Sequence, residues 1–346
     1  MMSNLLLFVA ITVISFVLVA CYRSVAIRNS WFDIPNHRSS HREMTPRSGG
    51  LVILIMYSVL IVFQFFTDQL KVSELTVLAI PLGIGLVGFI DDTVTLYPGF
   101  RFLAYLILVA ILVVAFSPLP PLNLWGYLVE NRWIISFIYI LAIAWFVNLF
   151  NFMDGINGIA GGQFIYLLAA SLSLLPAVHA PQLTLMIVIA ASVTGFLCWN
   201  FPFGKVFLGD AGSTFLAAVL ALLMLYTVKF QGASPWMWII LCACFVVDTG
   251  YTLVFRIFTR QVWYKPHASH AYQILARRWS SHSKVVVLIM LVNILWLWPL
   301  AWLAKVSADG GMIWCIVACL PLLGICWSVG AGKRMPLDKT ASISGK

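Results

Sequence analysis

Charged residues are scarce in this chain, and their scarcity decides which solvent surrounds it. Only 10% of the 346 residues are charged and 62% are hydrophobic, with a mean hydropathy of +0.98. In a water-soluble domain roughly a quarter of the residues are charged, so a fold that faces water on all sides is excluded. In lipid, backbone polar groups must pair internally, which leaves helices or closed barrels. Long apolar runs without alternation favour helices, so the sequence predicts an all-α membrane protein.

Several catalytic motifs are also missing. The chain has no G-x-x-x-x-G-K-[ST] loop, H-E-x-x-H motif, G-x-S-x-G elbow or G-x-G-x-x-G fingerprint, which argues against those enzyme classes. Its seven cysteines lie within or at the ends of apolar runs, where small packing residues are expected, and predict no disulfide. The hydrophilic stretches are too short for an independent soluble core, so residues 1–346 are predicted to form one membrane domain.

What the chain does contain is a series of apolar runs near bilayer length. A helical span needs about 20 apolar residues, and eleven segments are predicted to cross. They cover residues 4–22, 49–66, 75–90, 100–117, 133–150, 160–178, 183–200, 211–228, 235–255, 285–304 and 311–328. The first run lacks the basic leader of a signal peptide and is predicted to remain as a span. The predicted fold is a polytopic bundle of about eleven transmembrane helices.

The net charge of +9 is explained by topology. With the amino terminus outside, all but four of the 21 Lys and Arg residues fall in inside loops or in the tail. The four on the outside are Lys71, Arg132, Lys229 and Lys305. This asymmetry is the one that membrane insertion imposes, and the basic loops can attract anionic headgroups or nucleotide phosphates. Nucleic acid is therefore not a predicted partner.

Polar residues that can do chemistry gather in the loops assigned to the inside. They form four groups, which are Asp91-Asp92, residues 148–158, residues 200–213 and residues 267–270. The groups are far apart in sequence, but helix parity places them on one membrane face. A shared active site at the cytoplasmic face is therefore predicted.

Two of these groups place carboxylates at helix ends. Asp91 and Asp92 end an apolar helix, where an acid opposes the helix dipole, so a functional site and a solvated helix end both stay open. Asp210 lies at the start of the eighth predicted span. It can cap that helix, or it can hold Mg²⁺ against a phosphate at the helix N-terminus.

The third group combines amides with an acid. Asn148, Asn151 and Asp154 recur at a spacing of three and are followed by Gly155 and Gly158. Glycines allow close backbone approach, and the set suits an oxygen-liganded metal and phosphates. The alternative is amide-mediated helix packing, which would leave Asp154 as an unpaired acid near lipid.

The fourth group, residues 267–270, lies in a basic segment. This segment contains His267, His270, Lys265, Arg277 and Arg278. Contact with phosphate or pyrophosphate is predicted from these charges, and a solvated loop beside the membrane is the alternative.

Asp248 stands inside the ninth predicted span. An acid within the membrane is a functional hypothesis by default. It can instead pair with Arg256 two turns later, or mark a bend that brings it to the cytoplasmic surface.

In order and spacing, these groups resemble the polyprenyl-phosphate N-acetylhexosamine-1-phosphate transferases, glycosyltransferase family 4. The matching elements are Asp33-x-Pro35…Arg38…His41…Pro46-Arg47-x-Gly49-Gly50, Gly88-x-x-Asp91-Asp92, Asn148-x-x-Asn151-x-x-Asp154-Gly155-x-Asn157-Gly158 and Asn200…Lys205-Val-Phe207-Leu-Gly209-Asp210-x-Gly212-Ser213. The resemblance extends over about residues 30–285. The family includes the enzymes that start peptidoglycan, enterobacterial-antigen and O-antigen lipid intermediates.

The last loop resembles the branch that starts O-antigen or capsule-type glycans. The triple histidine of the peptidoglycan branch is missing, whereas Asp248-Thr249 and the run from His267 to Gln273 match the other branch. Two positions depart from its pattern. Ala268 replaces a frequent Arg, which removes one phosphate contact, and Asn157 replaces a frequent Asp, although an amide can still pair with uracil.

The resemblance implies that a UDP-N-acetylhexosamine and undecaprenyl phosphate react at the cytoplasmic face of a bacterial inner membrane and release UMP. UDP-N-acetylfucosamine, UDP-N-acetylquinovosamine and UDP-N-acetylglucosamine all stay open as donors, and a homodimer stays open as the assembly. The bilayer itself is the third partner.

The resemblance also implies roles for individual residues. Asp210 and Asp154 are expected to hold Mg²⁺, or Mn²⁺ in its place, with Asp92 near the metal or pyrophosphate. Asp91 is the expected base for the lipid phosphate, and direct attack is favoured over a covalent aspartyl-phosphate. The expected substrate contacts are Asn200, Phe207 and Asn157 for uridine, His267 and His270 for phosphates, and Asn148, Asn151, Lys205, Arg277 and Arg278 for the substrate at large.

Two other protein classes are carried as alternatives, a transporter and a non-catalytic lipid-binding protein. A transporter predicts polar residues near the bilayer midplane and broken helices in matched halves. Here the acids gather at one surface, and only Asp248 suits transport. A non-catalytic relative should have lost some of the acids.

Overall fold

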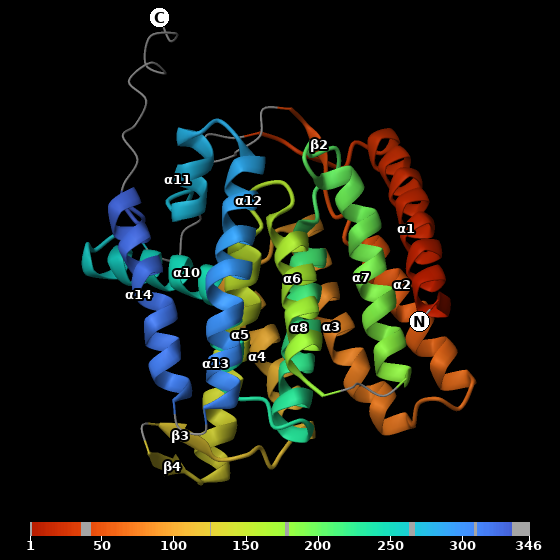
Figure 1. Ribbon diagram of the computed structural model, residues 1–346. Helices are drawn as coiled ribbons and strands as arrows, with labels where there is room; N and C mark the ends of the chain where they lie inside the picture. The colour runs from red at the N-terminus through yellow and green to blue at the C-terminus, as the bar shows by residue number, and fades with distance from the viewer. Residues whose placement is uncertain are drawn as a thin grey trace, which may run out of the picture.

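The computed structural model describes residues 2–35, 43–124, 126–176, 180–262, 267–307 and 310–333. Helices make up most of it (Figure 1). They are α1 Met2–Arg28, α2 Leu51–Phe66, α3 Val72–Val94, α4 Pro98–Ala115, α5 Arg132–Met153, α6 Ile159–Leu174, α7 Ala180–Asn200, α8 Gly209–Phe230, α9 Pro235–Leu241, α10 Ala243–Phe258, α11 Ala271–Arg278, α12 His282–Val292, the π-helix η1 Asn293–Leu297, α13 Trp298–Val306 and α14 Gly311–Val329. Two antiparallel hairpins join β1 Phe32–Asp33 to β2 Thr45–Pro46 and β3 Leu122–Leu124 to β4 Tyr127–Val129.

The chain is a polytopic helical membrane protein, as its composition predicts. Eight helical stretches among the described residues are long and apolar enough to cross a bilayer. The pair α9 and α10 meets the same test only as one span bent by 79°. Helices α2 and α6 have 16 residues each, which is short for a full crossing. Every predicted span overlaps a helix or a helix pair, and the count of eleven crossings stays a prediction.

The ninth predicted span, 235–255, is not the continuous helix that its hydropathy suggests. It breaks at Cys242, which ends α9 and begins α10. Neither proline nor glycine lies at this break, so the usual local causes of a kink are missing. The second arm packs mainly against α14 and α5, and its Asp248 also contacts α11, as described below. A hydropathy profile carries no signal for such a bend.

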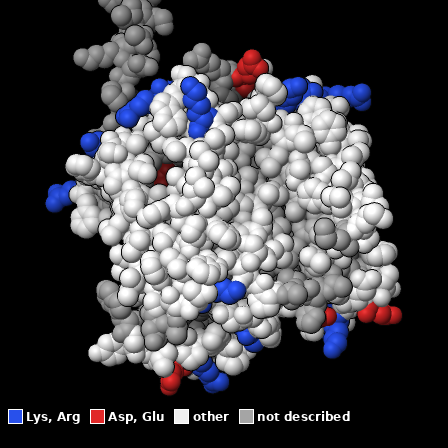
Figure 2. All heavy atoms as spheres, in the orientation of Figure 1, with Lys and Arg blue, Asp and Glu red and all other residues white. Residues whose placement is uncertain are grey.

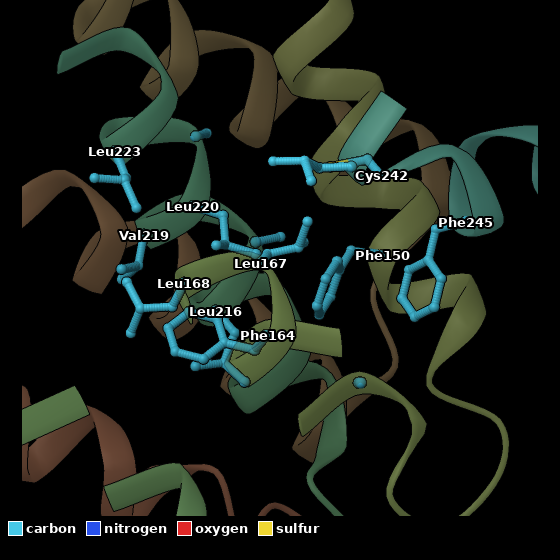
Figure 3. Packing of buried hydrophobic residues seen from close by; sticks show 14 of the residues in the cluster. Phe150, Phe164, Leu167, Leu168, Leu216, Val219, Leu220, Leu223, Cys242 and Phe245 are labelled. Carbon is cyan, nitrogen blue, oxygen red and sulfur yellow. The ribbon is translucent and has the colours of Figure 1, made fainter. Parts of the chain in front are cut away.

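Helix α8 is the central helix of the bundle. In its apolar window 83% of the residues are buried, against 11% in the window of α1. Leu216, Leu220 and Leu223 of α8 lie against Phe164 and neighbouring residues of α6, as Figure 3 shows. Burying these side chains supplies packing within the bundle, and it fixes the helix whose first turn carries Asp210.

The two ends of the bundle differ in what they carry. The C-terminal ends of α3 and α5, the N-terminal end of α8 and all of α11 lie at one end, called the site end from here on (Figure 1). The β3–β4 hairpin lies at the other end. Charged side chains on the visible face gather near both ends, with an uncharged band between them (Figure 2). This banding is the pattern that a bilayer imposes.

Candidate active site

The junction between α3 and α8 is built around the carboxylate of Asp92. Its Oδ1 accepts the backbone N–H of Asp210 at 3.1 Å, and its Oδ2 accepts that of Ala211 at 3.2 Å. The Ser48 hydroxyl donates to the same Oδ2 at 2.7 Å. Asp92 is only 5% exposed. It therefore caps the N-terminus of α8 from another helix, where a negative charge also suits the helix dipole.

Two glycines make this close junction sterically feasible. A Cβ on Gly88 of α3 would lie 2.4 Å from the backbone oxygen of Asp210. Gly209 has a φ of +77°, and a Cβ there would lie 2.6 Å from Oδ2 of Asp92. Any larger residue at either position would push α3 and α8 apart. The two glycines thus set how closely the acids approach.

Arg101, in the first turn of α4, joins two of the predicted acids. Its Nη1 forms ion pairs with Oδ2 of Asp91 and, at 2.9 Å, with Oδ2 of Asp210. The other oxygen of Asp91 accepts the backbone N–H of Leu96 at 2.7 Å. Asp91 and Asp92 therefore do different work, because one faces α4 and the other faces α8. This divergence is expected for neighbouring positions on a helix.

A cavity of about 310 Å³ opens beside this junction. The residues that line it are Asp33, Arg47, Asp92, Asn151, Asp154, Gly155, Ile156, Asn157, Asn200, Phe207, Leu208, Gly209, Asp210 and Gln273. Burial raises the pKa of Asp154 well above its usual value, and the nearby charges of Asp210 and Asp92 raise the pKa further. The cavity therefore concentrates negative charge contributed by α3, the end of α5 and the start of α8.

Amide side chains lock the loops around the cavity. Oδ1 of Asn200 accepts the backbone N–H of Gly158 at 2.6 Å, while its Nδ2 donates to the Val206 carbonyl at 2.9 Å. Nδ2 of Asn157 donates to the Pro202 carbonyl at 3.1 Å. Nδ2 of Asn151 donates to the Ser213 hydroxyl at 3.0 Å. These bonds join the α5–α6 loop to the α7–α8 loop and to the first turn of α8.

Helix α11 is attached to the site by a second acid that caps from a distance. Asp248 of α10 accepts the backbone N–H groups of Ala271 at 2.8 Å and Tyr272 at 3.0 Å. The Tyr272 hydroxyl donates to the carbonyl of Phe152 at 2.8 Å. Asp248 is 5% exposed, so it acts as a buried N-cap. Together these bonds place Gln273 on the wall of the cavity.

The histidines lie behind this wall rather than on it. His270 is 4% exposed, and its Nδ1 lies 3.4 Å from Oδ1 of Asp248. The ring of His267 is 4.9 Å from that of His270. Burial lowers the pKa of His267 to about 3, aided by the nearby His270 and Arg256, so His267 is neutral near pH 7. Neither histidine lines the cavity.

Sequence comparison places the chain among known proteins. Residues 74–228 match the model of glycosyl transferase family 4. The chain is 30% identical over 280 residues to the probable undecaprenyl-phosphate N-acetylglucosaminyl 1-phosphate transferase of Bacillus subtilis (strain 168), an alignment that covers 78% of this chain and 76% of that protein. The chain belongs to glycosyl transferase family 4.

Other relatives carry related names. The undecaprenyl-phosphate alpha-N-acetylglucosaminyl 1-phosphate transferase of Thermotoga maritima is 25% identical over 277 residues, which cover 80% of this chain and 84% of that protein. The decaprenyl-phosphate N-acetylglucosaminephosphotransferase of Mycobacterium leprae is 29% identical over 296 residues, covering 74% of this chain and 73% of that protein. The family match at residues 74–228 includes Asp91, Asp92, Asp154 and Asp210.

Family 4 resemblance implies a divalent cation, and the donors of the cavity fit one. Carboxylates of Asp154 and Asp210 and the amide of Asn151 are the oxygen ligands that Mg²⁺ accepts. Burial raises the pKa of Asp154 most, and the charges of Asp210 and Asp92 raise it further, so a cation would relieve both effects. Among the described residues no three His, Cys, Asp or Glu side chains form a complete cage. Mg²⁺ usually needs only one or two carboxylates beside substrate phosphates, so the set is sufficient.

The structure gathers only part of the predicted site. Asp92, Asn151, Asp154, Asn157, Asn200, Phe207 and Asp210 line one cavity. Asp91 does not line the cavity, but Arg101 pairs with both Asp91 and the cavity residue Asp210. Asn148, Lys205, His267, His270, Arg277 and Arg278 do not line it. The motif residues Arg38 and His41, and Lys265 of the basic loop, lie outside the described residues.

Three of the residues away from the cavity have defined surroundings. Lys205 is exposed, and its Nζ lies 5.9 Å from the ring centroids of Trp199 and Phe203. Arg277 donates through Nη2 to the carbonyl of Ala268 and so braces the histidine loop. Arg278 is exposed at the end of α11.

Sequence reasoning assigned no role to several residues that the site uses. Arg101 was counted only as a positive charge on the inside. Arg47, Asp33 and Gln273 were noted within motifs without a function, and Ser48 was not noted. A basic residue in the first turn of an apolar helix, ten positions after Asp91, is the one signal that could have singled out Arg101.

Proposed function

We propose that the chain transfers N-acetylhexosamine-1-phosphate from a UDP-sugar to undecaprenyl phosphate, at the cytoplasmic face of the bacterial inner membrane. The observation that supports this most directly is the cavity at the site end, where Asp92, Asp154 and Asp210 meet from three separate elements. The named functions of the relatives support the same reaction class. The products would be undecaprenyl-diphosphate-sugar and UMP.

The reaction joins two anions, so the site must lower their repulsion. An oxygen of the lipid phosphate would attack the sugar-bearing phosphorus of the UDP-sugar, and the bond to the bridging oxygen would break, with its electron pair leaving on UMP. Asp210 and Asp154 would hold Mg²⁺ or Mn²⁺, which would supply charge neutralisation. Arg47 adds a positive charge on the cavity wall. Direct attack remains the proposed route.

The protein's own acids would divide the remaining tasks. Asp92 caps α8 and so fixes the backbone of Asp210. Asp91 is the proposed base for a protonated lipid phosphate, and its ion pair with Arg101 has to open for that role. Until then Arg101 keeps both Asp91 and Asp210 oriented. Phe207 and the amides of Asn157 and Asn200 are proposed to hold the uridine, since all three line the cavity.

The finer identity rests on the last loop. The match of residues 248–273 to the branch that starts O-antigen or capsule-type glycans supports a role in lipopolysaccharide biosynthesis. UDP-N-acetylfucosamine, UDP-N-acetylquinovosamine and UDP-N-acetylglucosamine are the proposed donors to be compared. A homodimer remains a prediction.

The alternative is a transporter or a non-catalytic lipid-binding protein. Asp248, the residue that best suited transport, instead caps α11. That contact gives this acid a structural partner and favours the enzyme.

The test is UMP release and lipid-linked product from purified protein with undecaprenyl phosphate, Mg²⁺ and each UDP-N-acetylhexosamine. Asp210→Asn should abolish turnover, whereas Asp68→Asn, an exposed acid just beyond α2, should leave it unchanged. Absence of turnover with every donor, from protein shown to be folded, would refute the transferase. Nucleotide-independent transport in liposomes would support the alternative.

A further inference from the structure

A second and larger cavity lies at the end of the bundle opposite the catalytic acids. Its volume is about 780 Å³; α2, α3, α4, α6, α7 and α8 line it, and it is partly open to its surroundings. The inner wall is apolar and includes Phe164 and Leu168 of α6 with Val219, Leu220 and Leu223 of α8. Figure 3 shows Phe164, Leu168, Val219 and Leu220 near one another, with Leu223 further along α8. The proposed transfer reaction uses none of them.

The outer rim of this cavity is polar. Gln64, Glu74, Gln182 and Gln231 stand at the ends of α2, α3, α7 and α8 that point away from the site. The side-chain oxygens of Gln182 and Gln231 are buried without a hydrogen-bond partner. Among the described residues that line the cavity, Glu74 alone carries a charge. Oε2 of Glu74 already accepts the backbone N–H of Lys71 at 2.8 Å. The rim thus carries one carboxylate and two buried acceptors that a ligand reaches once the glutamine side chains turn, which suits a cationic hydrogen-bond donor.

A cavity of this size does not stay empty in a packed bundle. Protein interiors hold few voids larger than a water molecule, and buried amide oxygens without partners are costly. Water would satisfy the rim but not the apolar inner wall, since a site holds water only where polar partners surround it. An occupant with an apolar chain and a polar donor at one end satisfies both parts.

We propose that this cavity binds one acyl chain of a phospholipid whose head group carries an ammonium, such as phosphatidylethanolamine. The chain would lie along Leu168, Leu220 and Leu223. The ammonium would donate to Gln182 and Gln231 and pair with Glu74. The membrane supplies this ligand in excess, because the cavity lies within the part of the bundle that spans it.

The bound chain would support the catalytic end through two helices. Helices α3 and α8 pack directly against each other; they carry Asp92 and Asp210 at their site ends and line the cavity at their other ends. Filling the cavity would hold these helices in register. The inference therefore goes beyond the proposed transfer reaction, and it does not depend on which sugar is moved.

Native mass spectrometry of the purified full chain tests the proposal. After mild delipidation we expect one phospholipid to remain bound to the wild-type protein. Leu223→Trp, which fills the cavity, should lose it, while Leu320→Trp on the exposed face of α14 should keep it. Retention by Leu223→Trp equal to that of wild type would overturn the proposal.

Reloading with defined lipids tests the head group. We expect wild type to prefer phosphatidylethanolamine over phosphatidylglycerol by about three- to tenfold, the effect of one hydrogen bond. Gln182→Leu with Gln231→Leu should weaken that preference while keeping the protein folded, and the part that remains should depend on Glu74. Equal affinity of wild type for both lipids, or displacement of the bound lipid by undecaprenyl phosphate, would refute the assignment. None of these readouts requires transferase activity, so they stand apart from the test of the proposed function.

Discussion

Two acids that face the same cavity should have opposite effects on stability when each is replaced by alanine. Asp92→Ala removes the acceptors of the backbone N–H groups of Asp210 and Ala211. An unpaired buried donor costs about 1–3 kcal/mol, so the loss of both acceptors predicts a destabilisation of about 2–6 kcal/mol. Asp154→Ala instead removes a carboxylate whose pKa is raised by burial and by the charges of Asp210 and Asp92, and which accepts no hydrogen bond from the described residues to offset that cost. We expect it to be neutral or stabilising in metal-free protein.

The assay is thermal unfolding of both variants in detergent with chelator, beside wild type. Ser48→Ala serves as a control because it removes one bond to Asp92 and leaves the two backbone bonds in place; its Tm should fall between those of wild type and Asp92→Ala. Both aspartate variants should lose transfer activity, which separates stability from function. A Tm for Asp92→Ala equal to or above that of Asp154→Ala would refute the capping argument.

Three further predictions concern charge at the site end. Because the pKa of Asp154 is raised in the folded protein, the folded state keeps a proton that the unfolded chain releases. The stability of metal-free protein should therefore fall as pH rises above about 4 towards the raised pKa. Unfolding measured at several pH values should show a smaller fall in Asp154→Ala. Arg101→Gln should lower kcat about 10- to 100-fold because Asp91 and Asp210 lose their orienting partner; Arg101→Lys should recover part of the rate, and equal rates for both variants would contradict the role. Asp248→Ala should weaken the attachment of α11 by about 1 kcal/mol or more; faster trypsin cleavage after Arg278, compared with wild type, would show it, and unchanged cleavage would count against the cap.

Much of the fold could be predicted because lipid leaves few choices. Scarce charge and long apolar runs place the chain in lipid. There, unpaired backbone polar groups are too costly for most architectures, and helices pair these groups internally. The apolar runs themselves located the helices. A bend in the ninth span was one of the alternatives for Asp248, but the sequence did not place it at Cys242 and did not predict the π-helix Asn293–Leu297.

The sequence predicted which residues lie at the candidate site better than it predicted what each residue does there. Helix parity predicted that Asp92, Asp154 and Asp210 share one face, and the cavity brings them together. His267 and His270 follow the same parity, yet His270 caps the N-terminus of α11 and neither histidine lines the cavity. Parity specifies an end of the bundle, and it does not specify the direction in which a side chain points.

The sequence by itself determined the solvent, the helices and the end of the bundle where the acids gather, since hydropathy and helix parity act along the chain. Only the tertiary structure decided that Asp92 and Asp248 cap α8 and α11, and that Arg101 joins Asp91 to Asp210. Those roles depend on which backbone N–H groups and which charge lie within about 3 Å of each carboxylate. Such distances arise when α3, α4, α8, α10 and α11 pack, so no local pattern in the sequence specifies them.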